Sequence, residues 1–400
     1  MKKLNIGLFT DTYFPQINGV ATSVHILEKE LTSMGHNVYI FTTTNPKTQR
    51  KHNVFRMPSM PFVFLPTHRV GLFYPPQVLL KIRKLKLDIV HTHSEFSLGI
   101  FGKVVSEVAK IPQIHTYHTL WEDYVHYVAG GHIITAKMAR RYSKYFCNMA
   151  RAVIAPTDKA RNALLSYDVK RPIRVIPTGI DFAPFAPSGF CPNEIAKLRK
   201  SLGIMPNDKV LLMLGRVAKE KSMDVIVRQM PEIIKCVPNA KLVVVGDGPA
   251  RAELQALAKS LGMAERTIFT GSRPWSEIGK YYQLGDVFVS ASTSETQGLT
   301  YVEAMAAGVP VVAKYDKSIA ELVRHGETGY TFVNDSDLPD IAARVLNDST
   351  EARRIADTAL ASIDHLSGKR FGQNVERLYR EVVAAYPKGK RRGRRTFRLR

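Results

Sequence analysis

Residues 287–308 read VFVSASTSETQGLTYVEAMAAG, and this stretch carries the pattern on which the fold depends. The run Val287–Ser290 predicts a short buried strand, and the apolar spacing after Gly298 predicts a helix. A polar loop that contains Glu295 joins the two. A strand that leads through a short loop into a helix is the repeating unit of parallel α/β sheets.

The same unit recurs on both sides of this stretch. The predicted strands are Leu4–Phe9, Asn37–Thr43, Asp88–His91, Gln113–Thr116, Ala152–Ala155 and Ile173–Ile176, then Val210–Leu214, Leu242–Val245, Thr267–Thr270, Val287–Ser290 and Val309–Ala313. Two such series predict an α/β chain of two Rossmann-like, doubly wound parallel-sheet domains, residues 1–180 and 194–370, joined by a Pro- and Gly-containing linker at 181–193. We expect the two domains to face each other across a cleft. A helix at 371–386 has one apolar face and is expected to join the first domain.

Size and composition fit this organisation. The chain has 400 residues, of which 45% are apolar and 23% charged, enough for two globular cores. The first apolar run is too short for a signal peptide, and eighteen apolar residues never occur together. Three cysteines lie far apart and form no metal-type pair or disulfide framework, which favours a reducing, cytoplasmic location.

The net charge of +22 is unevenly distributed along the chain. Residues 1–180 carry a net charge of +14, residues 181–387 carry none, and the last thirteen residues add +8. The tail, 387–400, is too basic to pack and is expected to be disordered. This asymmetry favours a polyanionic partner, either nucleic acid or an anionic membrane.

A helix predicted within residues 132–151 is the candidate membrane contact. Apolar residues recur there at helical spacing beside the cations Lys137, Arg140, Arg141 and Lys144, a pattern typical of interfacial helices. A core helix with a solvated basic face explains the pattern equally well. For nucleic acid we find no recognition helix, zinc-ligand motif or aromatic stacking platform.

The loop and helix of the opening stretch predict a diphosphate site. Backbone N–H groups at the helix start, from Gly298 through Leu299 to Thr300, attract anions together with the helix dipole. Glu295 can accept hydrogen bonds from sugar hydroxyls, and Glu303 can reach a ribose diol. An ordinary capped helix is the alternative interpretation.

Three further segments follow predicted strands. In 215–221, GRVAKEK, the cations Arg216 and Lys221 can converge on phosphate oxygens, although a solvated basic loop has the same composition. Gly19, between the first strand and the first helix, allows a ligand to approach the backbone closely. His118, in 115–119, HTYHT, lies after a strand, where a structural role is the alternative.

These motifs, in this order and spacing, resemble retaining glycosyltransferase family 4 over nearly the whole chain. The resemblance is strongest to the bacterial 1,2-diacylglycerol 3-glucosyltransferases, through TDTYFPQINGVATSV, IHTYHTLWEDYVHY, VIPTGID and SASTSETQGLTYVEAMAAG. It implies a GT-B fold, UDP-glucose as the donor, diacylglycerol as the acceptor, retention of the α configuration and a peripheral location on the inner face of the cell membrane. The resemblance also implies a role for each motif residue. Arg216 and Lys221 bind the diphosphate together with the backbone at Gly298–Thr300, and Gly19 closes over the phosphates. Glu295 binds the hexose, Glu303 binds the ribose, and His118 lies at the reacting sugar.

The sequence predicts no required metal. The one D-x-D match, residues 335–337, is remote in sequence from the phosphate motifs, and we interpret it as a helix cap. Arg216, Lys221 and the helix dipole supply the positive charge instead, so we expect Mg²⁺ at most to stimulate the activity. Transfer of mannose or galactose to another lipid or to a polymer remains the alternative within the family.

Overall fold

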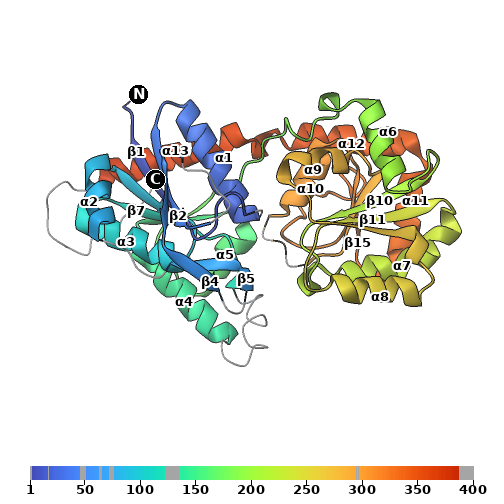
Figure 1. Cartoon of the computed structure of the whole chain (residues 1–400), viewed down its shortest axis with the longest axis horizontal. Helices are drawn as coiled ribbons and strands as arrows, with labels where there is room; N and C mark the ends of the chain where they lie inside the picture. The colour runs from blue at the N-terminus through green and yellow to red at the C-terminus, as the bar shows by residue number, and fades with distance from the viewer. Residues whose placement is uncertain are drawn as a thin grey trace. The chain divides into compact units, whose positions relative to one another are not determined.

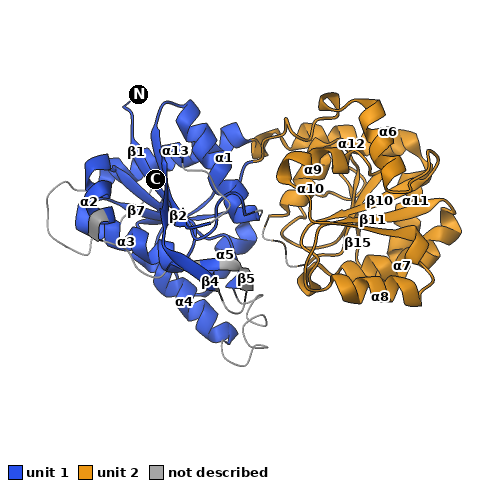
Figure 2. Ribbon diagram, viewed as in Figure 1, with its two compact units in different colours: residues 1–179, 368–400 blue, residues 180–367 orange. Residues whose placement is uncertain are grey.

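The computed structural model describes residues 2–16, 18–45, 51–62, 65–71, 76–121, 135–293, 295 and 297–386. It divides the chain into two compact units (Figures 1 and 2): residues 1–179 with 368–400 form unit 1, and residues 180–367 form unit 2. The basic tail at 387–400 lies outside the described residues. Among the helices that are described, none combines the length and apolar character that crossing a bilayer requires.

Unit 1 contains a parallel sheet with the strand order β3-β2-β1-β6-β7-β8-β9. Its strands are β1 Asn5–Phe9, β2 Asn37–Thr43, β3 Val54–Met57, β6 Ile89–Thr92, β7 Gln113–Thr116, β8 Ala152–Ala155 and β9 Ile173–Val175. Its helices are α1 Gly19–Ser33, α2 Pro76–Leu85, α3 Ser97–Ala109, α4 Ala136–Met149, α5 Asp158–Ser166 and α13 Gly368–Ala385. β4 Ser59–Phe62 and β5 Leu65–Gly71 pair separately as an antiparallel hairpin.

Unit 2 contains a second parallel sheet with the order β12-β11-β10-β13-β14-β15. Its strands are β10 Lys209–Leu214, β11 Ala240–Val245, β12 Thr267–Gly271, β13 Val287–Ser290, β14 Val311–Lys314 and β15 Tyr330–Phe332. Its α-helices are α6 Pro192–Ser201, α7 Met223–Cys236, α8 Arg251–Ser260, α9 Trp275–Tyr282, α10 Leu299–Ala306, α11 Leu338–Asn347 and α12 Ser349–Ser362. Short 3₁₀ turns are η4 Pro187–Gly189, η5 Lys219–Lys221, η6 Ala264–Arg266, η7 Asp335–Asp337 and η8 Asp364–Leu366.

The structure confirms the predicted α/β class with two parallel sheets, and all eleven predicted strands are present with ends shifted by up to two residues. Strands β3, β4, β5 and β15 were not predicted. β3 and β15 are edge strands of four and three residues.

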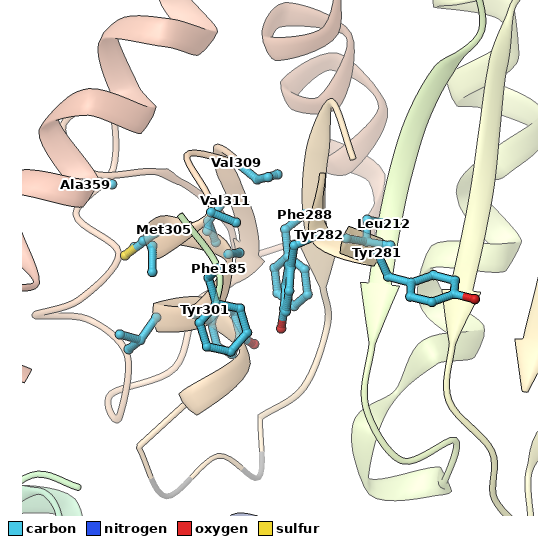
Figure 3. Close-up of a cluster of buried hydrophobic side chains, with 14 of the residues drawn as sticks. Phe185, Leu212, Tyr281, Tyr282, Phe288, Tyr301, Met305, Val309, Val311 and Ala359 are labelled. Carbon is cyan, nitrogen blue, oxygen red and sulfur yellow. The ribbon is translucent and has the colours of Figure 1, made fainter. Parts of the chain in front are cut away.

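The segment 181–193, predicted as a linker, packs on unit 2. Phe185 is buried, and its ring lies 5.7 Å from that of Tyr282 and 6.4 Å from that of Trp275. Figure 3 shows Phe185 among the buried side chains of the core of this unit, which also include Tyr282 and Tyr301. Burying one aromatic side chain provides enough apolar area to hold an irregular segment in place.

Helix α13 packs in unit 1 although it is the last element of the described chain. Its buried face consists of Phe371, Val375, Leu378, Tyr379 and Val382, which join the core formed by α1 and the sheet. A Cβ atom at Gly372 would lie 2.6 Å from Cβ of Glu30, so the small residue allows α13 to approach α1. The Tyr379 hydroxyl lies 2.7 Å from Nδ1 of His91 in β6, which fixes the helix against the sheet.

Candidate functional site

The ends of β10 and β13 carry the charged groups of unit 2. These strands are neighbours and run parallel, and the strand order reverses between them, so their carboxyl ends flank the switch point where open α/β sheets bind ligands. Lys221 follows β10 and Glu295 follows β13, and Lys221 Nζ lies 2.6 Å from Glu295 Oε1. The structure thus brings together two residues that are 74 positions apart and were predicted to share a site.

Arg216 lies in the same loop after β10 and pairs with Glu220. The Glu220 side chain is 5% exposed, so this carboxylate is held in place and orients the guanidinium. A guanidinium has five N–H donors, more than one carboxylate can accept, and matches phosphate oxygens in pairs. The sequence alone gave no role to Glu220, although this residue lies in the segment 215–221 that contains the two cations.

Two glycines give the site its backbone shape. Gly298 precedes α10 with a φ of 73°, in the left-handed region, and a Cβ atom there would lie 2.8 Å from the Tyr301 ring. At Gly246, after β11, a Cβ atom would lie 1.9 Å from the carbonyl oxygen of Gly215. The loops after β10 and β11 therefore touch through their backbones, and the first turn of α10 presents the N–H groups of Leu299 and Thr300.

Glu303 points to Tyr282 inside unit 2. The Tyr282 hydroxyl donates to Glu303 Oε2 at 2.8 Å and also lies 3.1 Å from the carbonyl oxygen of Thr300. Burial raises the pKa of Glu303 to about 7, and the hydrogen bond from Tyr282 opposes this shift. Glu303 is thus a carboxyl group whose charge depends on pH near neutrality, and Tyr282 is a partner that the sequence did not reveal.

Asp335 and Asp337, the D-x-D match, have structural partners. Asp335 Oδ1 accepts from Lys314 Nζ at 2.8 Å, and Asp337 Oδ2 accepts from the backbone N–H of Asn334 at 3.1 Å. This capping box belongs to η7, one turn before α11. Across the described ranges, His, Cys, Asp and Glu side chains form no group of three or more that could hold a metal ion.

In unit 1, the loop after β1 is held by its polar residues. The Asp11 carboxylate accepts from the Ser94 hydroxyl at 2.5 Å, from the Ser97 hydroxyl and from the backbone N–H of Leu98 at 3.1 Å, at the start of α3. Asn18 caps α1, which begins at Gly19, through a 2.9 Å bond to the backbone N–H of Ala21. Gly19 is exposed at the carboxyl edge of the sheet.

His118 follows β7 at the same edge of the unit 1 sheet. Its ring is half-buried, and Nε2 lies 3.1 Å from Nδ1 of His93, which follows β6. Neighbouring protein atoms desolvate the His118 ring and lower its pKa to about 3, with a smaller contribution from His115. At neutral pH the imidazole is therefore uncharged.

Helix α4 separates into three faces. Ala139, Ser143, Phe146 and Cys147 are buried, so part of the apolar spacing that predicted an interfacial helix belongs to the core of unit 1. Met138, Tyr142 and Tyr145 are exposed, on a second face. The cations Lys137, Arg140, Arg141 and Lys144 occupy the third, where Lys144 pairs with Asp168 at 2.8 Å and Arg140 lies over the Tyr167 ring. The described part of this helix is thus a core helix that also exposes apolar and basic faces.

Helix α3 adds an apolar ridge that the sequence analysis did not identify. Phe96, Ile100, Val104 and Val108 recur every four residues and are each more than 40% exposed. Phe96 lies beside Tyr142 of α4, with the ring centroids 6.4 Å apart. We refer to these four residues with Met138, Tyr142 and Tyr145 as the α3–α4 surface.

The two units match two different families of known proteins. Residues 17–183 match the family described as Glycosyltransferase Family 4, and residues 194–361 match Glycosyl transferases group 1. The chain is 38% identical, over 95% of its length and 86% of the relative, to the alpha-monoglucosyldiacylglycerol synthase of Streptococcus pneumoniae. The enzyme of the same name from Acholeplasma laidlawii is 33% identical over 95% of this chain and 98% of the relative.

Solved structures share the whole fold. HepE of Anabaena, crystallised with UDP and glucose, superposes with a TM-score of 0.76 at 20% identity, covering 94% of this chain and 99% of that one. Sucrose-phosphate synthase of Thermosynechococcus elongatus gives a TM-score of 0.76 at 22% identity, covering 95% and 99%. The two parallel-sheet units therefore form a GT-B fold, as the sequence predicted.

The raised pKa of Glu303 predicts a pH-dependent cost to the stability of unit 2. Above its unfolded pKa of 4.5, the folded chain retains the proton that the unfolded chain releases, so stability falls as pH rises towards the folded pKa of about 7. Relative to wild type, Glu303→Gln should raise the free energy of unfolding by an amount that grows by on the order of 2–3 kcal/mol between pH 5 and pH 8.

Urea unfolding monitored by the fluorescence of Trp275, in a Trp121→Phe background, reports on unit 2 because these are the two tryptophans of the chain. Glu265→Gln, at an exposed carboxyl, is the control and should leave the pH dependence unchanged. A pH-independent effect of Glu303→Gln would mean that the Glu303 carboxyl ionises normally.

Proposed function

The chain belongs to glycosyltransferase family 4 and is a hexosyltransferase, and we propose that it transfers glucose from UDP-glucose to the 3-hydroxyl of 1,2-diacylglycerol with retention of the α configuration. The observation that carries this proposal is the Lys221–Glu295 pair at the switch point of unit 2, beside Arg216 and the start of α10. The names of the two curated relatives and the UDP and glucose bound by HepE support the choice of donor and acceptor.

In this proposal unit 2 binds the donor. As the bond between C1 of glucose and the diphosphate breaks, the electron pair leaves with UDP, and negative charge grows on the diphosphate. Arg216, Lys221 and the backbone N–H groups of Leu299 and Thr300 stabilise that charge without moving. The ammonium of Lys221 has three donors, so it can serve a phosphate oxygen while it remains bonded to Glu295.

The two carboxylates bind hydroxyl groups of the donor. Glu295, 12% exposed and oriented by Lys221, accepts from hexose hydroxyls, and Glu303 accepts from the ribose diol. Unit 1 handles the acceptor, with Gly19 and His118 at the carboxyl edge of its sheet. The acceptor hydroxyl oxygen forms the new bond to C1, and its proton passes to the diphosphate oxygen that leaves with the electron pair of the broken bond.

We further propose that the protein acts as a peripheral protein on the cytoplasmic face of the cell membrane. The α3–α4 surface offers exposed apolar side chains beside the cations of α4, and this combination is typical of interfacial contact with anionic lipid. The net charge of +14 in residues 1–180, against zero in 181–387, supports contact through unit 1. Because the sequence carries no recognition helix, zinc-ligand motif or aromatic stacking platform, we propose no nucleic-acid partner.

Removing one charged group of the donor site should lower turnover strongly. Arg216→Ala, Lys221→Ala and Glu295→Ala are each expected to reduce turnover of UDP-glucose with diacylglycerol about a hundredfold, because one preorganised group of this kind contributes roughly 3 kcal/mol to the transition state. Lys219→Ala is the matched control, since this lysine lies in the same turn but is 77% exposed. Near-wild-type turnover in all three variants would remove these residues from the site.

Activity should survive a chelator. Protein cations and a helix start meet the diphosphate in this proposal, so EDTA should leave most of the turnover intact, and Mg²⁺ should stimulate it only modestly. The measurement is the initial rate with EDTA and after repletion with Mg²⁺ or Mn²⁺. Complete loss that either ion restores would contradict the proposed role of Arg216 and Lys221.

Charge reversal on α4 should weaken membrane binding. Arg140→Glu, Arg141→Glu and Lys144→Glu together should reduce binding to anionic vesicles by several kcal/mol at low salt, about 1 kcal/mol or more for each site. The loss should shrink as salt screens surface charge beyond about 10 Å at 0.1 M.

The matched control reverses Arg228, Lys235 and Lys259, which are exposed on unit 2. UDP binding in solution should be unchanged in both triple variants. Unchanged vesicle binding of the α4 variant would move the contact elsewhere, and serine at Ile100 and Val104 would then test the ridge of α3.

A further inference from the structure

Four histidines lie together at the carboxyl edge of the unit 1 sheet. His91 and His115 belong to β6 and β7, and His93 and His118 follow those strands. The ring centroids of His91 and His93 are 3.9 Å apart. Those of His93 and His118 are 5.4 Å apart, and these two rings are stacked with an angle of 25° between their planes. The cluster lies next to the switch point of this sheet, because the strand order reverses between β1 and β6.

The histidines of this cluster differ in how many of their ring nitrogens are hydrogen-bonded. Both nitrogens of His91 are engaged, Nδ1 with the Tyr379 hydroxyl and Nε2 with the Thr116 hydroxyl, each at 2.7 Å. His93 differs: Nδ1 lies 3.1 Å from His118 Nε2, whereas its own Nε2 is buried and has no hydrogen-bond partner in the described structure. His91 cannot serve that nitrogen because its two ring nitrogens are already bonded.

This arrangement restricts where the protons lie. Burial lowers the pKa of both His93 and His118, so each ring is uncharged near neutral pH and carries one N–H. In the bond between them, either His93 Nδ1–H donates or His118 Nε2–H donates. In the second case His93 would carry its proton on the buried Nε2, as an N–H without an acceptor. Buried N–H groups without acceptors are rarer than buried acceptors without donors, so the first case is favoured.

We propose that His93 donates from Nδ1 to Nε2 of His118 and thereby holds His118 in the tautomer that carries its proton on Nδ1. His118 is half-buried and lies at the edge where the substrate binds in the proposed function, on which this part of the inference rests. It therefore meets an oxygen of the bound sugar as an uncharged hydrogen-bond donor and not as a base. His93 is a positioning residue, since it acts through His118.

The first test is the tautomer of His118 in the wild-type full chain. Histidine labelled with ¹⁵N gives distinct signals for protonated and unprotonated ring nitrogens, and His118→Gln identifies the signals that belong to His118. We expect a protonated Nδ1 and an unprotonated Nε2. A protonated Nε2 in the wild-type protein would overturn the proposal without any further variant.

Two substitutions at His93 separate its donor from its volume. The side-chain amide of Asn can place an N–H near the position of Nδ1, so His93→Asn should keep the proton of His118 on Nδ1. His93→Phe fills the space but has no donor, so the proton of His118 should no longer be held on Nδ1. Thr92→Val is the matched control, because Thr92 is equally buried, directly precedes His93 at the end of β6 and bonds to Ile114 and His115. It should leave the His118 signals unchanged.

Kinetics give the second measurement. His93→Phe should lower kcat roughly ten- to hundredfold, as expected for a misaligned donor, with the KM for UDP-glucose within about twofold of wild type, and His93→Asn should recover most of the loss. Equal losses in both variants with an unchanged tautomer would overturn the positioning role. If the wild-type chain transfers no sugar, the proposed function fails, while the tautomer still decides the role of His93.

Discussion

The strands of both main sheets run parallel, so every strand of a sheet ends at the same edge, and the chemistry of the chain follows from this constraint. In unit 2 the constraint brings the loop after β10 to the loop after β13 and allows Lys221 to bond to Glu295. In unit 1 it brings the residues after β6 and β7 together, so that His93 meets His118. Interior strands of such sheets are mostly apolar, and the polar residues His91 and His115 of β6 and β7 lie near the carboxyl ends of their strands.

The two edges are suited to different parts of one reaction. At the edge of unit 2, cations are paired with carboxylates, which lets a phosphate and a sugar be bound by groups that already neutralise one another. At the edge of unit 1, burial keeps the imidazoles of His91, His93 and His118 uncharged. Anionic groups are therefore best stabilised in unit 2, and neutral hydroxyl groups are best aligned in unit 1.

The sequence predicted the fold class, eleven of the strands and a shared site for Lys221 and Glu295, because apolar runs and helix starts are local signals. It could not predict partners that depend on three-dimensional contact. Glu220, four residues after Arg216 in an irregular loop, and Tyr282, which reaches Glu303 from another helix, contact residues of the predicted site. The ridge of α3 was missed because its apolar residues alternate with buried ones, so that exposure is visible only once α3 has packed. In α4, the predicted interfacial face mixed exposed Met138 and Tyr142 with Phe146, which belongs to the core.

Lipid chromatography of the reaction product tests the central claim most directly. The purified full chain is incubated with diacylglycerol vesicles and, in parallel, with radiolabelled UDP-glucose, UDP-galactose or GDP-mannose. The donor site and the relatives of the chain predict that label enters the lipid from UDP-glucose, as a single glycolipid with the α configuration. Labelled lipid from GDP-mannose or UDP-galactose alone, or a β-configured product, would contradict the account.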